Sequence, residues 1–441
     1  MLRKTAIFAL VFALCITCCG CDFFTADTAE LLSPPALSDD LKLISDAIEK
    51  SNANTDYTME YPQSGEYRSA VVQKDVDGDG VNEAFAFYST KDGEVEMMNI
   101  NVVCSVERSW KSTAVQTIVA AGVHRVEFCD LDQDGICEIL VGWQIYSTSE
   151  MQLAVYSFKD GKLTQRMLNR YNHFVICDLD ENNTDEVFIV EMDPTKQQNT
   201  ASLYGFTEGG VVQVGKCALD GKVQSFGHPT VSELSSGKSA VYIDSVKGIG
   251  AITEVIIYEK GKLLNPLYDE QLAETNKTLR AVSFVTQDFN DDGVLEIPVQ
   301  LNVPSVSTSA AAEKLYLTNW CSFNGEFLTT QVTSMINVID GYYYNLPSKW
   351  VGSIAILKDT ENRIREIYTY DTEKMEVGKS LLYFRAINLR DWEKGIYDAL
   401  GLIEVGRTEN SVIACRIAYK AGVTFDDVQK NFGIFNGEVK S

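Results

Sequence analysis

The 441-residue chain has few histidines, a deficit of basic residues and, after its first twenty residues, no long hydrophobic run. Its only histidines, His124, His173 and His228, lie far apart in the sequence and share no spacing typical of metal ligands. Lysine and arginine total 38 against 62 aspartates and glutamates, which gives a formal net charge of −24. This charge argues against nucleic acid as a partner, because two polyanions repel each other, and suits bound cations or basic molecules.

The sequence also lacks the linear motifs of several enzyme and metal-site classes. It has no G-x-S-x-G, no H-E-x-x-H and no glycine-rich loop that would cradle a phosphate. The seven cysteines from Cys104 onward contain no C-x-x-C, so nothing indicates a zinc site or a disulfide framework. Cys129 and Cys177 each precede an acidic segment, and we expect them to be small, buried strand residues.

The N-terminal segment is the one long apolar stretch. A basic start precedes an apolar run at residues 6–16, which is typical of a secretory signal and too short to span a membrane. Its end resembles a bacterial lipoprotein signal, with Cys21 as the expected lipidation site and Cys18 and Cys19 as alternatives. We therefore expect residues 1–20 to be removed and the protein to be held by lipid at the extracellular face of the cell membrane.

A nonapeptide rich in acidic residues recurs along the chain. The copies read DVDGDGVNE from Asp75, DLDQDGICE from Asp130, DLDENNTDE from Asp178 and DFNDDGVLE from Asp288. The first two intervals are each about 50 residues and the third is about twice that, so a further copy that has lost its acids is expected near Thr230. An apolar strand flanks each acidic copy on both sides, and an aromatic hairpin follows later in most units.

Each unit thus reads as strand, acidic loop, strand, hairpin and strand, which is the composition of a four-stranded propeller blade. The sequence predicts a mainly β fold, a β-propeller with five recognisable blades over residues 57–335 and five to seven blades in total. Residues 21–56 are expected to form a tether that contains a short helix. Residues 336–441 mix strands with helices and are predicted to form a small α+β domain, with degenerate blades as the alternative.

The acidic loops have the spacing that calcium requires, since this ion prefers several oxygen ligands. Positions 1, 3, 5 and 9 supply carboxylate or amide oxygens, and position 6 is a glycine, or Asn183 in the third copy, that accepts a left-handed backbone. An EF-hand differs, because its glutamate stands at position 12 and helices flank its loop. The expected ligands of up to four structural calcium ions are Asp75, Asp77, Asp79 and Glu83; Asp130, Asp132, Asp134 and Glu138; Asp178, Asp180, Asn182 and Glu186; and Asp288, Asn290, Asp292 and Glu296.

The repeated pattern D-x-[DN]-x-[DN]-G-x-x-E over residues 57–335 resembles the FG-GAP and VCBS repeats of integrin-α-type propellers and of many bacterial surface proteins. The resemblance implies calcium ions that hold the blade loops on one face of a ring. The chain departs from these repeats in lacking clear Phe-Gly and Gly-Ala-Pro signatures, apart from Phe226-Gly227.

These features predict a lipid-anchored extracellular protein whose calcium-stabilised propeller binds an extracellular protein or glycan. No residue is assigned a catalytic role, so the chain is predicted not to be an enzyme, with its histidines in the core or in loops. The alternative is a propeller-based enzyme acting on extracellular polysaccharide, because the acids of such enzymes carry no linear motif. An enzyme would need a funnel of convergent polar and aromatic side chains at the centre of the ring, distinct from the calcium loops.

Overall fold

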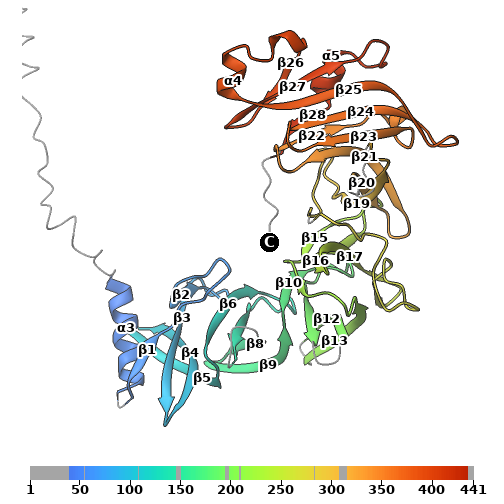
Figure 1. Cartoon of the computed structure of the whole chain (residues 1–441). Helices are drawn as coiled ribbons and strands as arrows, with labels where there is room; N and C mark the ends of the chain where they lie inside the picture. Colours follow the sequence, from blue (N-terminus) through green and yellow to red (C-terminus); the bar gives the residue numbers. More distant parts are fainter. Residues whose placement is uncertain are drawn as a thin grey trace, which may run out of the picture.

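The chain folds into a row of antiparallel β-sheets that follow one another round an open arc (Figure 1). The fold was obtained as a computed structural model. The predicted lipidation site, Cys21, lies outside the described residues, and no helix among those residues is long and apolar enough to cross a membrane. The structure describes residues 39–53, 55–107, 109–145, 150–193, 198–207, 210–282, 284–306 and 315–435.

The first three sheets share one plan, in which an inner strand leads through an acidic loop to strands that run outward. Figure 1 shows the inner strands β2, β6 and β10 on the concave side of the arc. The first sheet holds β1 (Tyr57–Met59), β2 (Val71–Lys74), β3 (Glu83–Asp92), β4 (Val95–Val106) and β5 (Ser109–Val119); the second holds β6 (Gly122–Cys129), β7 (Glu138–Gln144), β8 (Met151–Lys159) and β9 (Lys162–Tyr171); the third holds β10 (His173–Cys177), β11 (Glu186–Asp193), β12 (Gln198–Thr207) and β13 (Gly210–Leu219).

The fourth sheet is the degenerate repeat expected near Thr230. Its inner strands are β14 (Ser225–Phe226) and β15 (Thr230–Glu233), and a short turn without acidic residues leads from β15 to β16. The backbone of Leu234 closes this turn by donating a 2.8 Å hydrogen bond to the Lys238 carbonyl. The sheet continues through β16 (Ser239–Lys247), β17 (Gly250–Glu259) and β18 (Lys262–Leu264).

The C-terminal part of the chain completes a fifth sheet and forms a sixth. The predicted domain boundary at residue 336 falls inside β21, because β22 and the final strand β28 continue the same sheet. The fifth sheet holds β19 (Ile297–Val303), β20 (Leu315–Phe323), β21 (Leu328–Asn337), β22 (Tyr342–Asn345) and β28 (Phe432–Ile434); the sixth holds β23 (Ile354–Asp359), β24 (Ile364–Asp371), β25 (Glu376–Asn388), β26 (Ile403–Arg407) and β27 (Ser411–Ile417); the helical turns are α4 (Leu389–Glu393), α5 (Phe425–Lys430), η1 (Ser348–Trp350) and η2 (Asp398–Leu400).

An apolar core fills each space between consecutive sheets. Between the first and second sheets, the rings of Phe87 and Trp143 meet edge to face with centroids 6.4 Å apart. The aromatic residues of the hairpins join these cores, as Tyr156 and Phe158 do here, so their alternation reflects packing. Successive side chains of a strand point to opposite faces, so an inner sheet contributes to two cores. This stacking accounts for the propeller-like order of the sheets.

The two outermost faces of the array are covered by helices. On α3 (Asp39–Ser51), the side chains of Ile44, Ala47 and Ile48 are buried against the first sheet, as the 3.6-residue period of the helix dictates. The helix expected in the tether therefore belongs to the folded body. At the other end, Trp392 of α4 packs over buried Val412 of the sixth sheet. The predicted ring is therefore not closed, because the faces that would meet are already covered.

Candidate functional site

The four acidic loops adopt one hydrogen-bonded shape. In each, the backbone N–H at position 2 donates to the glutamate at position 9, over 2.9 to 3.2 Å, and the N–H at position 6 donates to the aspartate at position 1, over 2.8 to 3.0 Å. Asn183 adopts the left-handed backbone of the glycines that it replaces, with φ of 67°, so the third loop keeps this shape. The position-1 aspartates are Asp75, Asp130, Asp178 and Asp288, and the position-9 glutamates are Glu83, Glu138, Glu186 and Glu296.

The loops bring three of the four expected ligand positions together. In the first three loops, carboxylate oxygens from positions 1, 3 and 9 all lie within 4.8 Å of one another. The residues at position 5 instead accept a hydrogen bond from the backbone at position 7, over 2.6 to 2.9 Å, and are not part of these triads. The position-3 residues are Asp77, Asp132, Asp180 and Asn290, and the position-5 residues are Asp79, Asp134, Asn182 and Asp292.

The electrostatics of the loops favour a bound cation. Oδ1 of both Asp130 and Asp132 and Oε1 of Glu296 are buried and accept no hydrogen bond from the described residues. Burial, together with the neighbouring aspartates, raises the pKa of Glu138 and of Glu186 to about 7. A divalent ion would supply both the missing partner and the missing positive charge. The acidic triads thus fit a metal of calcium type.

The first three loops also contact their neighbours along one end of the inner strands. The backbone N–H of Cys137 donates a 2.7 Å hydrogen bond to the carbonyl of Val76, which joins the second loop to the first. The side chain of Gln133 donates to the carbonyl of Asn183, which joins the second loop to the third. A cation bound in one loop would therefore stiffen a contact shared with the next.

A second cluster, which we call the histidine pocket, lies at the opposite end of the inner strands. His124 stands near the start of β6, His173 begins β10, and His228 precedes β15. The five residues from His173 to Asp178 span roughly 16 Å of extended strand, so this pocket is separate from the acidic loops. The pocket encloses about 280 Å³ and is lined by Ser64, Gly65, His124, Arg125, Tyr171, Asn172, His173, Phe174 and His228.

The hydrogen bonds around His124 define its tautomer. The hydroxyl of Ser64 donates its proton to the His124 carbonyl over 3.0 Å. The same hydroxyl lies 3.3 Å from Nε2 of His124 and can only accept there, so Nε2 carries the proton. Nδ1 is then an acceptor for the hydroxyl of Tyr171, which lies 2.7 Å away. Burial lowers the pKa of His124, and the charge of Arg125 adds to this effect. His124 and Tyr171 therefore form a neutral pair whose polar atoms are satisfied.

His173 is the histidine with a free acceptor nitrogen. Its Nε2 lies 3.0 Å from the Phe226 carbonyl, which can only accept, so Nε2 carries the proton and Nδ1 has a lone pair. Nδ1 of His228 likewise lies 2.9 Å from the Pro229 carbonyl, and its Nε2 lies 3.5 Å from Nη1 of Arg125. Among the described residues, Nδ1 of His173 has no such partner. Burial lowers its pKa, so this nitrogen is available to accept a proton at neutral pH.

No connection among these histidines is visible in the sequence, because their contacts are non-local. They come from the second sheet, the third sheet and the approach to β15, and only the packing of consecutive sheets places them together. One signal was present. His124 and His173 occupy similar positions, a few residues before the acidic loops of successive repeats. The prediction of core or loop histidines did not anticipate this convergence: His228 lies in a loop, and His124 and His173 are half-buried strand residues.

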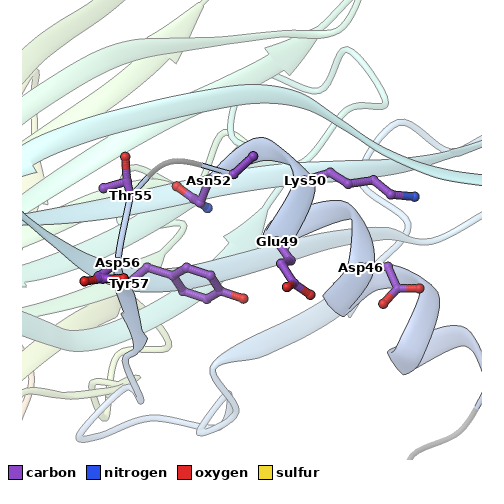
Figure 2. Close-up of a pocket in the computed structure, with 8 residues that line it drawn as sticks. Asp46, Glu49, Lys50, Asn52, Thr55, Asp56 and Tyr57 are labelled. Atoms are coloured by element: carbon purple, nitrogen blue, oxygen red, sulfur yellow. The ribbon is translucent and has the colours of Figure 1, made fainter.

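Two other polar regions carry no comparable set of groups. Figure 2 shows a wide hollow of about 1080 Å³ between α3 and β1, where Asp46, Glu49 and Asp56 are exposed. Its acidic side chains are solvated, and no buried acid or base lies among them. It therefore offers a polar surface and no catalytic constellation.

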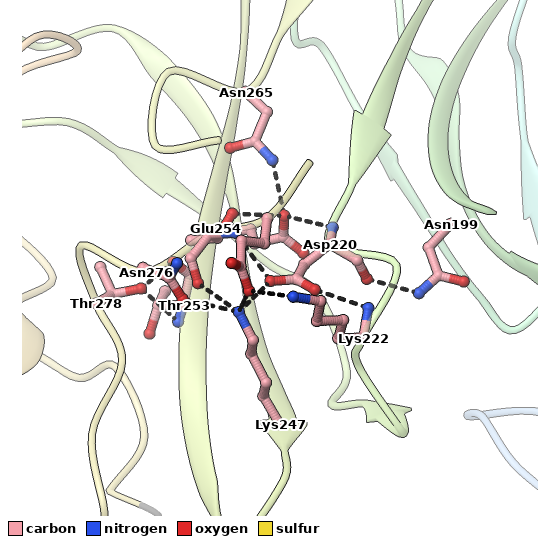
Figure 3. A network of polar contacts seen from close by, with 11 residues as sticks. Asn199, Asp220, Lys222, Lys247, Thr253, Glu254, Asn265, Asn276 and Thr278 are labelled. Atoms are coloured by element: carbon pink, nitrogen blue, oxygen red, sulfur yellow. Dashed lines mark hydrogen bonds and ion pairs between the residues drawn. The ribbon is translucent and has the colours of Figure 1, made fainter. Parts of the chain in front are cut away.

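The second region is a buried polar network that joins the third and fourth sheets (Figure 3). Nζ of Lys247 lies 2.7 Å from Oδ2 of Asp220 and 2.9 Å from Oε2 of Glu274. Oε1 of Glu254 accepts hydrogen bonds from the Asp220 backbone and from the Asn265 side chain. Burial raises the pKa of Glu254 to about 7. Because an ammonium group already balances the carboxylates, this network is structural.

No family model and no curated protein matches the chain, so the resemblance to FG-GAP and VCBS repeats remains one of loop pattern. Among solved structures, the chain is similar to the exotype rhamnogalacturonan lyase YesX, with 13% identity and a TM-score of 0.29. The match covers 74% of this chain and 65% of the lyase, so the chain spans less than two thirds of the length of that lyase. The chain is also similar to the rhamnogalacturonan lyase YesW, with 10% identity and a TM-score of 0.29. This match covers 73% of this chain and 71% of the lyase. A third similar structure is the Pseudomonas aeruginosa periplasmic gluconolactonase PpgL, with 11% identity and a TM-score of 0.25. This match covers 73% of this chain and 86% of the gluconolactonase.

At these TM-scores the three similar structures assign this chain neither a fold nor a reaction. All three are enzymes. They stand against the prediction that the chain is not an enzyme, and that prediction is withdrawn. Its physical basis was weak, because it relied on the absence of linear motifs, whereas the histidine pocket is assembled from distant segments.

Proposed function

We propose that the chain is an enzyme that acts on an extracellular polysaccharide, with the histidine pocket as its active site. The observation that carries this proposal is the convergence of all three histidines of the chain on one pocket beside Arg125 and Tyr171. A pocket with few, convergent polar groups and shifted pKa values is the usual form of an active site. The pocket includes residues of the inner strands β6 and β10, which lie on the concave side of the arc (Figure 1).

His173 is assigned as the proton acceptor. Its Nδ1 is the one ring nitrogen of the three histidines without a protein partner among the described residues, and burial keeps the ring neutral, as a base requires. The carbonyl of Phe226 fixes the ring through Nε2. The pair of His124 and Tyr171 forms a rigid wall whose hydrogen bonds leave little freedom to either ring. Apart from the Phe226 carbonyl, these assignments use only groups that line the pocket.

The acidic loops are assigned a supporting role. Up to four calcium ions would hold the ends of the inner strands that lie away from the pocket, and the contacts between loops would keep consecutive sheets in register. Lipidation at Cys21 would place the enzyme at the extracellular face of the membrane, where a polysaccharide substrate is available. Calcium is structural in this scheme and takes no part in the chemistry.

The test is turnover of a panel of purified polysaccharides by the full-length protein with calcium, followed by the release of reducing ends. His173→Ala should lower turnover about 100-fold or more, the usual effect of losing a general base. Gln165→Ala, an exposed side chain on the outer strand β9, is the matched truncation and should leave turnover unchanged. Absence of turnover by the wild type on the whole panel, or full activity of His173→Ala, would overturn the proposal.

A further inference from the structure

We propose that the histidine pocket binds the carboxylate of an acidic sugar residue, and that Arg125 is the residue that selects for it. This inference rests on the proposed function and names the substrate class of the same site. It is drawn from the charge of the pocket wall and from the hydrogen bonds of the arginine.

The charge of the pocket wall is opposite to that of the molecule. The chain carries a net charge of −24, yet none of the residues that line the pocket is acidic. The wall instead holds three histidine rings and one guanidinium group. Burial lowers the pKa values of His124 and His173, and the charge of Arg125 adds to this effect, while its Nη1 lies 3.5 Å from Nε2 of His228. An anionic group is the complement of such a wall.

Protein contacts hold the guanidinium group of Arg125 through Nε, Nη1 and its planar face. Its guanidinium lies over the ring of Phe174, with 4.6 Å from Cζ to the ring centroid. Nε donates to Glu127 over 2.8 Å, and Nη1 approaches the Phe174 carbonyl at 3.4 Å and Nε2 of His228 at 3.5 Å. Nη2 has no protein partner among the described residues. A fixed guanidinium with free N–H groups is suited to a carboxylate.

Neutral groups complete a site of sugar size. The side chain of Asn172 accepts from the Met192 backbone over 2.6 Å through Oδ1, so its amide nitrogen keeps two donors. Ser64 is docked on β6 by its backbone N–H, which donates to the His124 carbonyl over 2.8 Å. Hydroxyl groups of a sugar can accept from the Asn172 amide nitrogen, while Arg125 takes the carboxylate. The pocket thus distinguishes an acidic sugar from a neutral one by a single charged contact.

The experiment uses the three histidines as probes, because the chain has no others and all three line the pocket. Histidine signals of the full-length protein with calcium are followed by nuclear magnetic resonance during titration with a digalacturonic acid and with its neutral methyl ester. The acid should shift the signals and raise the pKa values of His124 and His173, since a nearby negative charge favours the protonated ring. The ester should bind at least tenfold more weakly.

Three variants locate the contact. Arg125→Gln should weaken binding of the acid at least tenfold, and Arg125→Lys, which keeps the charge without the planar fork, should lie between. Arg170→Gln removes an exposed arginine from the outer strand β9 and should bind as the wild type does. Thermal unfolding of each variant shows that it is folded. Equal binding of acid and ester, or unchanged binding by Arg125→Gln, would overturn the inference.

The outcomes separate this inference from the proposed function. Binding of the acid that depends on Arg125, without turnover of any polysaccharide, would leave the substrate class standing and remove the enzymatic proposal. Turnover of neutral polysaccharides that depends on His173 would do the reverse.

Discussion

Gly142 on β7 lies directly against the hydroxyl group of Tyr171 and leaves no room for a Cβ atom. The hydroxyl that it admits is the one that donates to Nδ1 of His124 over 2.7 Å. A glycine inside a strand weakens that strand, and the close approach of the Tyr171 hydroxyl explains why position 142 is nevertheless a glycine. The geometry of the pocket wall therefore depends on a strand that does not line it.

Gly142→Ala should destabilise the protein by about 1–3 kcal/mol, the usual cost of overpacking, because the new methyl group must displace the Tyr171 hydroxyl. Urea unfolding measures the free energy. In the double variant Gly142→Ala/Tyr171→Phe, the displaced hydroxyl is absent, so the loss should be smaller than the sum of the two single losses. Strict additivity would show that the two residues are not coupled.

Removal of calcium should lower the melting temperature, and its return should restore it. An ion that binds only the folded state, present at 100 times its dissociation constant, adds about 2.7 kcal/mol to the free energy of unfolding for each site. Asp288→Asn, at position 1 of the fourth loop, should reduce the stabilisation by calcium. Asp291→Asn, at the non-ligand position 4 of the same loop, should not. A melting temperature unaffected by EDTA would leave the loops as plain acidic turns.

The metal-free protein should lose stability as the pH rises. The pKa of Glu138 and of Glu186 in the folded state is about 7, above the ordinary value of 4.5. Their contribution to the free energy of unfolding is therefore fully present below about pH 4.5 and is lost as the pH rises through about 7. Melting temperatures in EDTA should therefore fall between pH 5 and pH 8. Calcium favours the ionised carboxylates, so the decline due to these two groups should disappear when it is bound. The same slope with and without calcium would contradict this prediction.

Glu254 should produce a pH dependence that calcium does not remove. Its pKa is also raised to about 7 by burial, but it lies in the network of Figure 3, away from the acidic loops. The pKa of Glu254 is higher in the folded state, as for Glu138 and Glu186, so stability is lost as the pH rises from about 4.5 through about 7 and Glu254 ionises. In saturating calcium, Glu254→Gln should flatten the decline in melting temperature over this range. An unchanged slope in this variant would place the effect elsewhere.

Truncation of the buried face of α3 should destabilise the whole array. Ile44 is fully buried against the first sheet, so Ile44→Ala should cost about 2–5 kcal/mol in urea unfolding. Its neighbour Leu43 is 44% exposed on the same helix, and Leu43→Ala should cost much less. Equal losses in the two variants would show that the helix does not cover the sheet.

Features that arise within one repeat could be predicted from the sequence. The acidic loops, the strands that flank them and the degenerate copy at Thr230 follow from local spacing and turn chemistry. The capping box of α5 is equally local, with Thr424 and Asp427 in reciprocal hydrogen bonds. Such features need no knowledge of what lies across the fold.

Features that depend on packing between repeats could not be predicted. The helix α3 was expected from its apolar period, but that period does not say which surface it covers. The strand β28 returns to the fifth sheet after the sixth is complete, so the C-terminal region looked like a separate domain in one dimension. The histidine pocket has the same origin, since His173 and His228 approach Arg125 from the third and fourth sheets.

A closed propeller must fit a whole number of blades round a circle, so adding or removing one blade alters the angle at every junction. In this array each end has its own helical cover, and each apolar core between sheets lies between two consecutive ones. The number of sheets is therefore not set by geometry. A repeat could be gained or lost between the pocket and the C-terminal cover while α3, the first three acidic loops and the histidines kept their mutual positions.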